Sequence, residues 1–170
     1  MNKKHIKRWG GVFLNNTKPP LTLLIQKDDN VDNTDNKLNL TSLSNAIASF
    51  QRALDEYEKD NTNEFVRDAC IQRFEYCYDL SAKYIKRHLS LISENPEEIK
   101  EISFQEVIRR AYTVGIIEHS WDQWWKYRDN RAATSRSYNE ERAKEVVSGL
   151  LVFNNEVNFL LTQLKKSHET

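Results

Sequence analysis

The sequence predicts an all-α protein, an antiparallel up-down bundle of four to five helices. Three observations support this class. Glycine and proline are scarce, at 4 and 3 of 170 residues, whereas a sheet-rich fold needs more turn residues. Hydrophobic residues recur at alternating spacings of three and four through most of the chain, which is typical of amphipathic helices. The gaps between these segments are short, so consecutive helices are expected to reverse direction beside one another.

The overall composition excludes several classes of function. A chain of 170 residues suits one domain with a sizeable core. Its 25 Lys and Arg balance its 25 Asp and Glu, so any basic surface for nucleic acid must be local. No apolar run approaches the roughly 20 residues of a membrane span, and the apolar residues 12–14 are too few for a signal peptide. We therefore expect a soluble cytoplasmic protein.

Cysteine and histidine are placed in a way that favours neither disulfides nor a metal site. Cys70 and Cys77 lie about two turns apart on one predicted helix, roughly 10 Å along its axis, which is too far for a disulfide. The four histidines are scattered, and none has a partner at metal-ligand spacing: His5, His88, His119 and His168. We expect no metal and no other cofactor.

Residues 1–38 differ from the predicted bundle domain, residues 39–167. They start with four Lys or Arg residues, contain a Gly pair and a Pro pair, and end in a run of Asp and Asn. No helical spacing passes through them, so we expect an extension that is disordered or loosely docked. The short apolar piece 21–25 is compatible with a strand. The basic start is compatible with a nucleic-acid-binding arm, although the acidic run follows closely.

Two long helices are predicted first, from about Thr41 to Lys59 and from about Glu64 to Ser93. The first has the apolar spacing of a bundle helix at Leu40, Leu43, Ile47, Phe50, Leu54 and Tyr57. The second is roughly 45 Å long and ends before Pro96, because the residue preceding a proline avoids helical geometry.

Capping boxes mark the starts of two shorter helices. Ser103 and Glu106 begin a helix that stops near Gly115, and Ser120 and Gln123 begin the next. This fourth helix carries three tryptophans within five residues: Trp121, Trp124 and Trp125. Such a cluster buries a large area or forms an interface, so we expect a core or dimer contact, with base stacking as the alternative.

The last helix is predicted to start near Tyr138, where Ser137 and Glu140 form a third capping box. Its apolar seam is unbroken and includes Val146, Leu150, Phe153, Val157, Leu160 and Leu164. A second apolar stripe beside this seam, Val147, Leu151 and Leu161, widens the hydrophobic face. A face this wide, together with the tryptophans, favours a homodimer.

The stretch 128–138, between the last two helices, is the main candidate for chemistry. It contains three arginines, Arg128, Arg131 and Arg136, and the tyrosine Tyr138. Guanidinium groups and the free amides at a helix start both favour phosphate, so a site for a nucleotide or RNA is one interpretation. The other is a set of surface arginines, Arg142 included, paired with the acidic residues Asp129, Glu140 and Glu141.

At this point the sequence resembles a known family. Residues 39–165 resemble the HepT-like proteins of the HEPN superfamily, in particular those called nucleotidyltransferase substrate-binding proteins. Residues 67–75 read Arg-Asp-Ala-Cys-Ile-Gln-Arg-Phe-Glu, which is similar to a signature of that family. Residues 131–138 fall where the family reads Arg-Asn-x-Thr-Ser-His-x-Tyr.

The resemblance implies a fold, a partner and roles for individual residues. It implies an HEPN-like helical bundle that forms a homodimer and pairs with a small, separately encoded nucleotidyltransferase in a two-component or toxin–antitoxin module. In HepT toxins the motif Arg and His cut RNA without a metal, and the partner silences them by transferring AMP to the motif tyrosine. Carried over, Arg131 is the motif arginine and Tyr138 is the AMP acceptor.

This sequence departs from the family motif at two positions. Ala132 stands where Asn is usual, and Arg136 stands where the catalytic His belongs. Histidine exchanges a proton near neutral pH, whereas arginine stays protonated. We therefore expect a partner subunit whose ribonuclease motif is degenerate, with an active ribonuclease toxin and a plain helical interaction module as the alternatives. Tyr138 is either the AMP acceptor or a residue that packs against the tryptophan helix.

Overall fold

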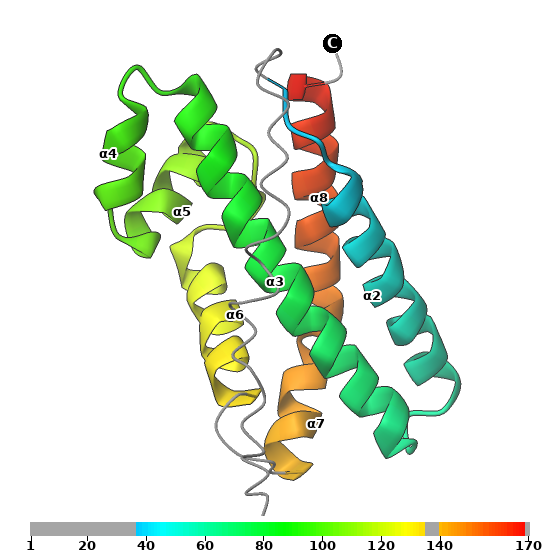
Figure 1. The fold of residues 1–170 in the computed structure, drawn as a ribbon. Coiled ribbons are helices and arrows are strands. Elements are labelled where there is room, and N and C mark those ends of the chain that lie inside the picture. The colour runs from blue at the N-terminus through cyan, green and yellow to red at the C-terminus, as the bar shows by residue number, and fades with distance from the viewer. Residues whose placement is uncertain (1–36, 135–139, 169–170) are drawn as a thin grey trace, which may run out of the picture. The chain divides into compact units, whose positions relative to one another are not determined.

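The computed structural model describes residues 37–134 and 140–168. The chain divides into two units, residues 1–34 and 35–170, and all described helices belong to the second. The described residues form helices and no strands (Figure 1), so the all-α prediction is confirmed: α2 (Thr41–Lys59), α3 (Glu64–Ile92), α4 (Pro96–Glu101), α5 (Phe104–Thr113), α6 (Trp121–Thr134), α7 (Glu140–Ser148) and α8 (Leu150–His168). The predicted boundary at residue 38 stays a prediction.

Helix α3 is the centre of the bundle and contacts each of the other described helices. Figure 1 shows α2 running down, α3 running back up across the middle, α6 running down and α7 with α8 running up again. This is the antiparallel up-down arrangement that the short connections predict. Three residues of α3 take part in polar contacts with other helices that are described below: Glu75, Asp79 and His88.

Several helix ends follow from local sequence. Asn63 caps α3 by accepting hydrogen bonds from the backbone N–H groups of Phe65 and Val66 at 3.0 and 3.3 Å. Ser103 caps α5 by accepting from the N–H of Glu106 at 3.2 Å, as predicted. The Glu106 carboxylate accepts a hydrogen bond from Arg110 one turn later.

Gly115 ends α5 in the left-handed conformation, with φ +77°. The N–H of Ile116 donates to the carbonyl of Ala111, and the N–H of Gly115 to that of Tyr112, both at 3.1 Å. This is a Schellman motif, which needs a positive φ after the helix and therefore favours glycine. It turns the chain into the loop 116–120 that leads to α6.

The structure differs from the sequence prediction in two helices. The short helix α4, absent from the prediction, starts at Pro96, a residue favoured in the first turn because it has no N–H to lose. The predicted continuous last helix is two helices, α7 and α8, which meet at Gly149. The N–H of Gly149 donates to the carbonyl of Val146, one residue nearer than in an α-helix, and glycine has low helix propensity. The expected helix start near Tyr138 lies outside the described residues.

An aromatic cluster joins four helices in the core. The Phe153 ring of α8 lies 4.9 Å from the Phe74 ring of α3 and 5.0 Å from the Tyr127 ring of α6, both edge-on, and 6.0 Å from the Phe50 ring of α2. Edge-to-face pairs at these distances are favourable in addition to the area they bury. The cluster fixes α6 against α3 and α8, and so fixes the residues that follow Tyr127.

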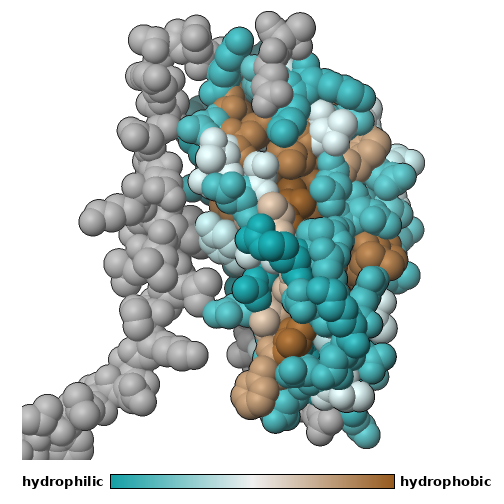
Figure 2. All heavy atoms as spheres, turned by 90° about the vertical axis from the view of Figure 1, so that its right-hand side faces the viewer, coloured by the Kyte–Doolittle hydropathy of each residue, from teal (hydrophilic) through white to brown (hydrophobic). Residues whose placement is uncertain are grey.

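The apolar face of the last helix is divided between the core and the surface. Figure 2 shows a hydrophobic strip, bordered by hydrophilic residues, on the side of the molecule that lies at the right of Figure 1. Of the second stripe predicted beside the seam, Val147 is buried, Leu161 is half-buried and Leu151 is exposed. Its neighbour Val152 is exposed as well. The stripe therefore contributes only in part to the core of one chain.

The structure bears on two features considered in the sequence, the cysteines and membrane-spanning segments. Cys70 and Cys77 are free and buried, and burial raises the pKa of their thiols to about 11 and about 12, so both are inert. Within the ranges that the structure describes, no helix is both long enough and apolar enough to cross a bilayer.

Candidate functional site

The last turn of α6 holds Arg131 against α3. Arg131 follows the buried Tyr127 by four residues, so it lies on the same face of α6 and points back toward the core. Its Nε donates to Asp79 Oδ1 at 3.2 Å and its Nη2 to Asp79 Oδ2 at 3.0 Å. This is a forked, charge-assisted pair, the strongest kind of arginine–carboxylate contact. The hydrogen bond to Asp79 raises the pKa of Arg131, so the side chain carries its charge permanently.

Glu75, one turn before Asp79 on α3, joins the same cluster. Its Oε1 lies 3.6 Å from Arg131 Nη1 and accepts a hydrogen bond from the Thr134 hydroxyl at 2.5 Å. We call these four residues, Glu75, Asp79, Arg131 and Thr134, the Arg131 cluster. Two carboxylates surround one guanidinium, so a phosphate that approaches Arg131 competes with Asp79 and Glu75. The guanidinium of Arg131 is thus already paired within the cluster, and it cannot exchange a proton.

The Tyr78 phenol lies near two of the predicted phosphate-binding arginines. Burial raises the pKa of the Tyr78 phenol, and the nearby charges of Arg128 and Arg131 oppose that shift. Arg128 is exposed. Arg128 and Arg131 therefore both lie near one phenol at the end of α6. Tyr78 is not among the predicted site residues, because its spacing from Phe74 and Ile85 is that of an ordinary apolar position on a bundle helix.

Arg142 on α7 is paired to neighbouring acids, as the surface interpretation of the arginines predicts. Its Nη2 lies 2.7 Å from Asp129 Oδ2 on α6, and its Nη1 lies 2.7 Å from Glu145 Oε2 on α7. The Asp129 pair fastens the start of α7 to the end of α6. In the chain, Thr134 precedes and Arg142 follows residues 135–139, and each makes a polar contact, Thr134 with Glu75 and Arg142 with Asp129.

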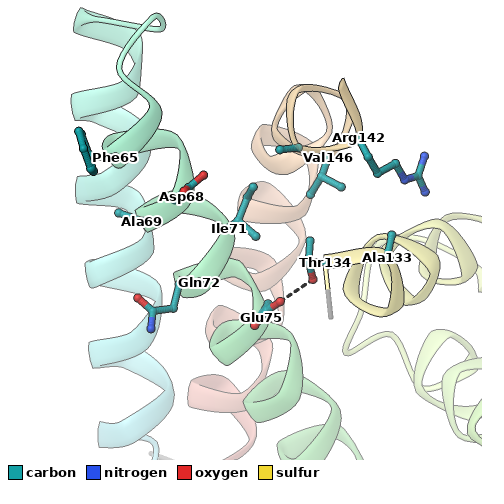
Figure 3. Close-up of a pocket in the computed structure, with 11 residues that line it drawn as sticks. Phe65, Asp68, Ala69, Ile71, Gln72, Glu75, Ala133, Thr134, Arg142 and Val146 are labelled. Carbon is teal, nitrogen blue, oxygen red and sulfur yellow. Dashed lines mark hydrogen bonds between the residues drawn. The ribbon is translucent and has the colours of Figure 1, made fainter. Parts of the chain in front are cut away.

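A cavity of about 460 Å³ lies beside the Arg131 cluster, between α3, α6 and α7 (Figure 3). It shares Glu75 and Thr134 with the cluster. Figure 3 shows Ile71 of α3 and Val146 of α7 facing each other across it, while Glu75 points toward Thr134. The remaining lining residues are Phe65, Asp68, Ala69, Gln72, Ala133, Arg142 and Ala143. Apolar walls with a few polar groups are typical of small-molecule sites.

The predicted site residues fall into three groups. Arg128 and Arg131 come together at the end of α6, whereas Arg136 and Tyr138 lie outside the described residues. The tryptophans differ in burial, although their spacing puts them on neighbouring positions of α6 and both Trp121 and Trp124 pack on Phe104. Trp124 is fully buried in the core, Trp121 is half-buried and packs on Phe104, and Trp125 is 53% exposed. Because Trp124 is buried in the core, only Trp121 and Trp125 are available for the expected dimer contact.

A second carboxylate network lies at the opposite end of α6, on Glu156 of α8. Glu156 is fully buried. It accepts the backbone N–H groups of Glu118 and His119 at 3.0 and 3.1 Å, the ring N–H of His119 Nδ1, and the indole N–H of Trp124 at 3.4 Å. Glu118, His119 and Glu156 place three possible metal-ligand atoms within 4.8 Å of one another. The donors already present satisfy Glu156, which indicates that it holds the loop 116–120.

His88 and His168 form a buried pair that no pattern in the sequence predicts. His88 Nδ1 on α3 lies 2.9 Å from His168 Nε2 on α8, with the rings nearly perpendicular. Burial lowers the pKa of both, assisted by His168 for His88 and by Lys37 for His168. Eighty residues separate them, so no local spacing reveals the pair.

Comparisons with known proteins identify relatives over most of the chain. Residues 38–166 match the family described as nucleotidyltransferase substrate binding protein like. A protein of Haemophilus influenzae (strain Rd) named probable ribonuclease HepT is 33% identical over 141 residues, covering 78% of this chain and 96% of that protein. These findings confirm the resemblance inferred from the sequence.

A solved structure points the same way. It comes from Haemophilus influenzae and is described as revealing the fold of a substrate-binding domain of a nucleotidyltransferase. Its TM-score is 0.70 at 31% identity, covering 75% of this chain and 99% of that one. The bundle from α2 to α8 therefore has the fold of that domain.

Proposed function

Because this chain belongs to the family of nucleotidyltransferase substrate-binding-like proteins, we propose that it is the helical subunit of a two-component module. Its partner is a separately encoded small nucleotidyltransferase, and the module is of the toxin–antitoxin type. The observation that carries the proposal is the Arg131 cluster. It holds the motif arginine at the end of α6, directly before the segment that contains the motif tyrosine, Tyr138.

The chemistry of the arginines supports a role in binding phosphate. Arg128 and Arg131 both lie near Tyr78 at one end of α6, and Arg136 follows within the motif. In the proposed transfer, a nucleoside triphosphate is held by these charges and the Tyr138 phenol oxygen attacks its α-phosphorus. The new O–P bond forms as the bond to the β-phosphate breaks, the phenol proton is lost, and pyrophosphate leaves. Arg136 replaces the motif histidine and stays protonated, so the ribonuclease motif of this subunit is degenerate.

AMP transfer tests this function directly. The chain is incubated with the partner, ATP and magnesium, and its intact mass is measured. Addition of one or more AMP units is expected, and Tyr138→Phe is expected to abolish it. Tyr112→Phe is the matched control, because Tyr112 is 50% exposed on α5. An unchanged mass gain in Tyr138→Phe, or no gain with a demonstrably active partner, would exclude Tyr138 as the acceptor.

The subunit acts as a homodimer in this proposal. The exposed Trp125 and the half-buried Trp121 supply apolar area on α6 of a kind enriched at interfaces. Light scattering at micromolar concentration is expected to give twice the mass of the chain, with Trp125→Ala shifting it toward the monomer and Tyr112→Ala leaving it unchanged. A monomeric mass for the unaltered chain would contradict the proposal.

An active ribonuclease is the second candidate, favoured by the name of the Haemophilus influenzae relative and by two carboxylates beside Arg131. Glu75 or Asp79 would then take over the proton transfer that Arg136 cannot perform. RNA cleavage by the unaltered chain, abolished by Arg131→Ala and by Glu75→Gln, would support it. The degenerate motif instead predicts weak or absent cleavage, restored by Arg136→His, because general acid–base catalysis contributes about 10²–10⁴-fold.

A further inference from the structure

We propose that the cavity between α3, α6 and α7 is the base subsite of a bound nucleotide and that it prefers bases with an exocyclic amino group. The inference rests on the proposed function for one element only, the phosphate held at Arg131. A volume of about 460 Å³ lies within the range of roughly 300–1,000 Å³ of small-molecule sites. The cavity is thus large enough for a nucleoside.

The cavity lies next to the Arg131 cluster, as the base of a nucleotide lies next to its phosphate. Glu75 and Thr134 belong both to the cavity lining and to the Arg131 cluster. A ligand in the cavity therefore reaches the guanidinium of Arg131 without leaving the surface of α3. A molecule that occupies the cavity and also contacts Arg131 needs an uncharged group joined to an anionic group.

The charge of the lining decides which end lies in the cavity. Asp68, Gln72 and Glu75 line the α3 side, and two of these three are carboxylates. Arg142 offers little compensation, because it already pairs with Asp129 and Glu145 and points away from α3 in Figure 3. Asp68 Oδ1 accepts a hydrogen bond from Arg67 Nε at 3.4 Å, and Glu75 lies 3.6 Å from Arg131, so both carboxylates are already partly compensated. Their remaining lone pairs accept N–H or O–H donors, which an ionised phosphate does not offer.

The apolar part of the lining suits a flat ring. Ile71 and Val146 face each other across the cavity, as Figure 3 shows, and three alanines leave room between the helices: Ala69, Ala133 and Ala143. Phe65, on the first turn of α3, is 79% exposed and lies at the edge of this lining. A base enclosed by Ile71 and Val146 presents its edge to Asp68, because Gln72 and Phe65 point to the other side of α3 in Figure 3.

The carboxylate makes the subsite selective for an amino group on that edge. Adenine and cytosine carry an exocyclic amine that donates to a carboxylate. Hypoxanthine and uracil carry at the same position a carbonyl oxygen, which a carboxylate repels, and their donor on that edge is the neighbouring ring N–H. The pairs AMP with IMP and CMP with UMP differ at this group and in the protonation of the neighbouring ring nitrogen. They separate base recognition from phosphate binding, which all four nucleotides share.

Titration calorimetry of the purified chain alone tests the subsite. AMP and CMP are expected to bind roughly tenfold more tightly than IMP and UMP, since a hydrogen bond to a charged group is worth about a factor of ten or more. Asp68→Asn should reduce the AMP-to-IMP ratio toward one, and Asp55→Asn, an exposed carboxylate on α2, should leave it unchanged. Ala69→Phe, which fills the cavity, should weaken all four nucleotides but not ribose 5-phosphate.

The outcomes separate this inference from the proposed function. Equal affinity for AMP and IMP, a ratio that survives Asp68→Asn, or nucleotide binding unaffected by Ala69→Phe would overturn the base subsite, even if AMP transfer to Tyr138 succeeds. No binding of any nucleotide at millimolar concentration would overturn it as well. Failure of AMP transfer with an intact AMP-to-IMP ratio would instead reject the proposed function and leave the subsite standing. Arg131→Ala should weaken AMP and IMP by the same factor.

Discussion

The two ends of α6 are each held by carboxylates, but in opposite ways. At the N-terminal end, Glu156 is fully buried, and backbone and ring N–H groups satisfy it. At the C-terminal end, Asp79 and Glu75 are only partly buried and share the single guanidinium of Arg131. A buried, fully satisfied network fixes a structure, whereas a partly exposed one with excess negative charge beside a cavity can exchange partners.

This contrast explains why we assign structure to one end and function to the other. Replacing the donors of Glu156 by a ligand would leave backbone N–H groups without partners in the core, which is costly. Replacing Asp79 at Arg131 by a phosphate exchanges one charge-assisted contact for another, and solvent can reach the displaced carboxylate. We therefore propose that an anion is bound and released at the Arg131 end.

The largest predicted effect is the loss of the Glu156 network. Glu156→Ala removes the acceptor of several buried donors and leaves a cavity, so we expect the free energy of unfolding to fall by about 3–5 kcal/mol. Urea denaturation measures the loss, and Asn155→Ala, exposed on the same helix, is the control. A loss below about 1 kcal/mol would mean that water replaces the carboxylate and that this end is not a fixed structure.

Loss of Arg131 is expected to have a smaller effect on stability. Arg131→Ala leaves Asp79 and Glu75 without their shared cation at a partly exposed site, so we expect a loss of about 1–2 kcal/mol. The difference in stability between the unaltered chain and the Arg131→Ala variant should shrink in high salt, because salt screens partly exposed pairs. The Glu156 effect should not depend on salt. A similar cost and a similar salt response for both variants would remove the distinction between the two ends.

The buried pair of His88 and His168 differs from both carboxylate networks because its members are titrating histidines. Burial lowers both pKa values, so the unfolded chain takes up protons at a higher pH than the folded one. The contribution of the pair is complete above the unfolded pKa of about 6.5 and is lost as the pH falls through the lower folded values. Lys37 adds positive charge nearby and acts in the same direction.

Urea denaturation between about pH 7.5 and pH 5.5, on either side of the unfolded pKa, measures this loss. His168→Phe keeps an aromatic ring against His88 and is expected to flatten the pH dependence. The unaltered chain should lose stability steadily below about pH 6.5. Equal pH dependence in both proteins would show that other groups titrate in this range.

The smallest predicted effect concerns Gly149, which joins α7 beside the cavity to α8 with its Glu156. A methyl group at this position meets Val146 O at 3.6 Å and Asn130 Nδ2 at 3.7 Å, which are ordinary contacts. Gly149→Ala should therefore stabilise the fold by about 0.5 kcal/mol through helix propensity. A destabilised variant would show that the joint needs the freedom of glycine.

The helices were predictable because they depend on local sequence. The apolar spacing placed α2 and α3 nearly to the residue, the Ser103 cap marked the start of α5, and Gly115 marked its end. These features act over one or two turns, which is why one sequence suffices to find them. The short α4 was missed although Pro96 and two following glutamates are typical of a helix start.

The pairing of polar side chains could be seen only once the helices were packed together. Asp79 meets Arg131 across 52 residues, Glu156 meets His119 across 37, and His88 meets His168 across 80. Each partner looks like an ordinary surface or stripe residue in its own helix, so periodicity cannot mark it. Local patterns were enough to find the family, the arginine-rich stretch and the helices other than α4, but not the break between α7 and α8 at Gly149. The packing of α3 against α6 and α8 determines which charges are shared and which are buried, because those contacts depend on how the helices pack rather than on spacing along the chain.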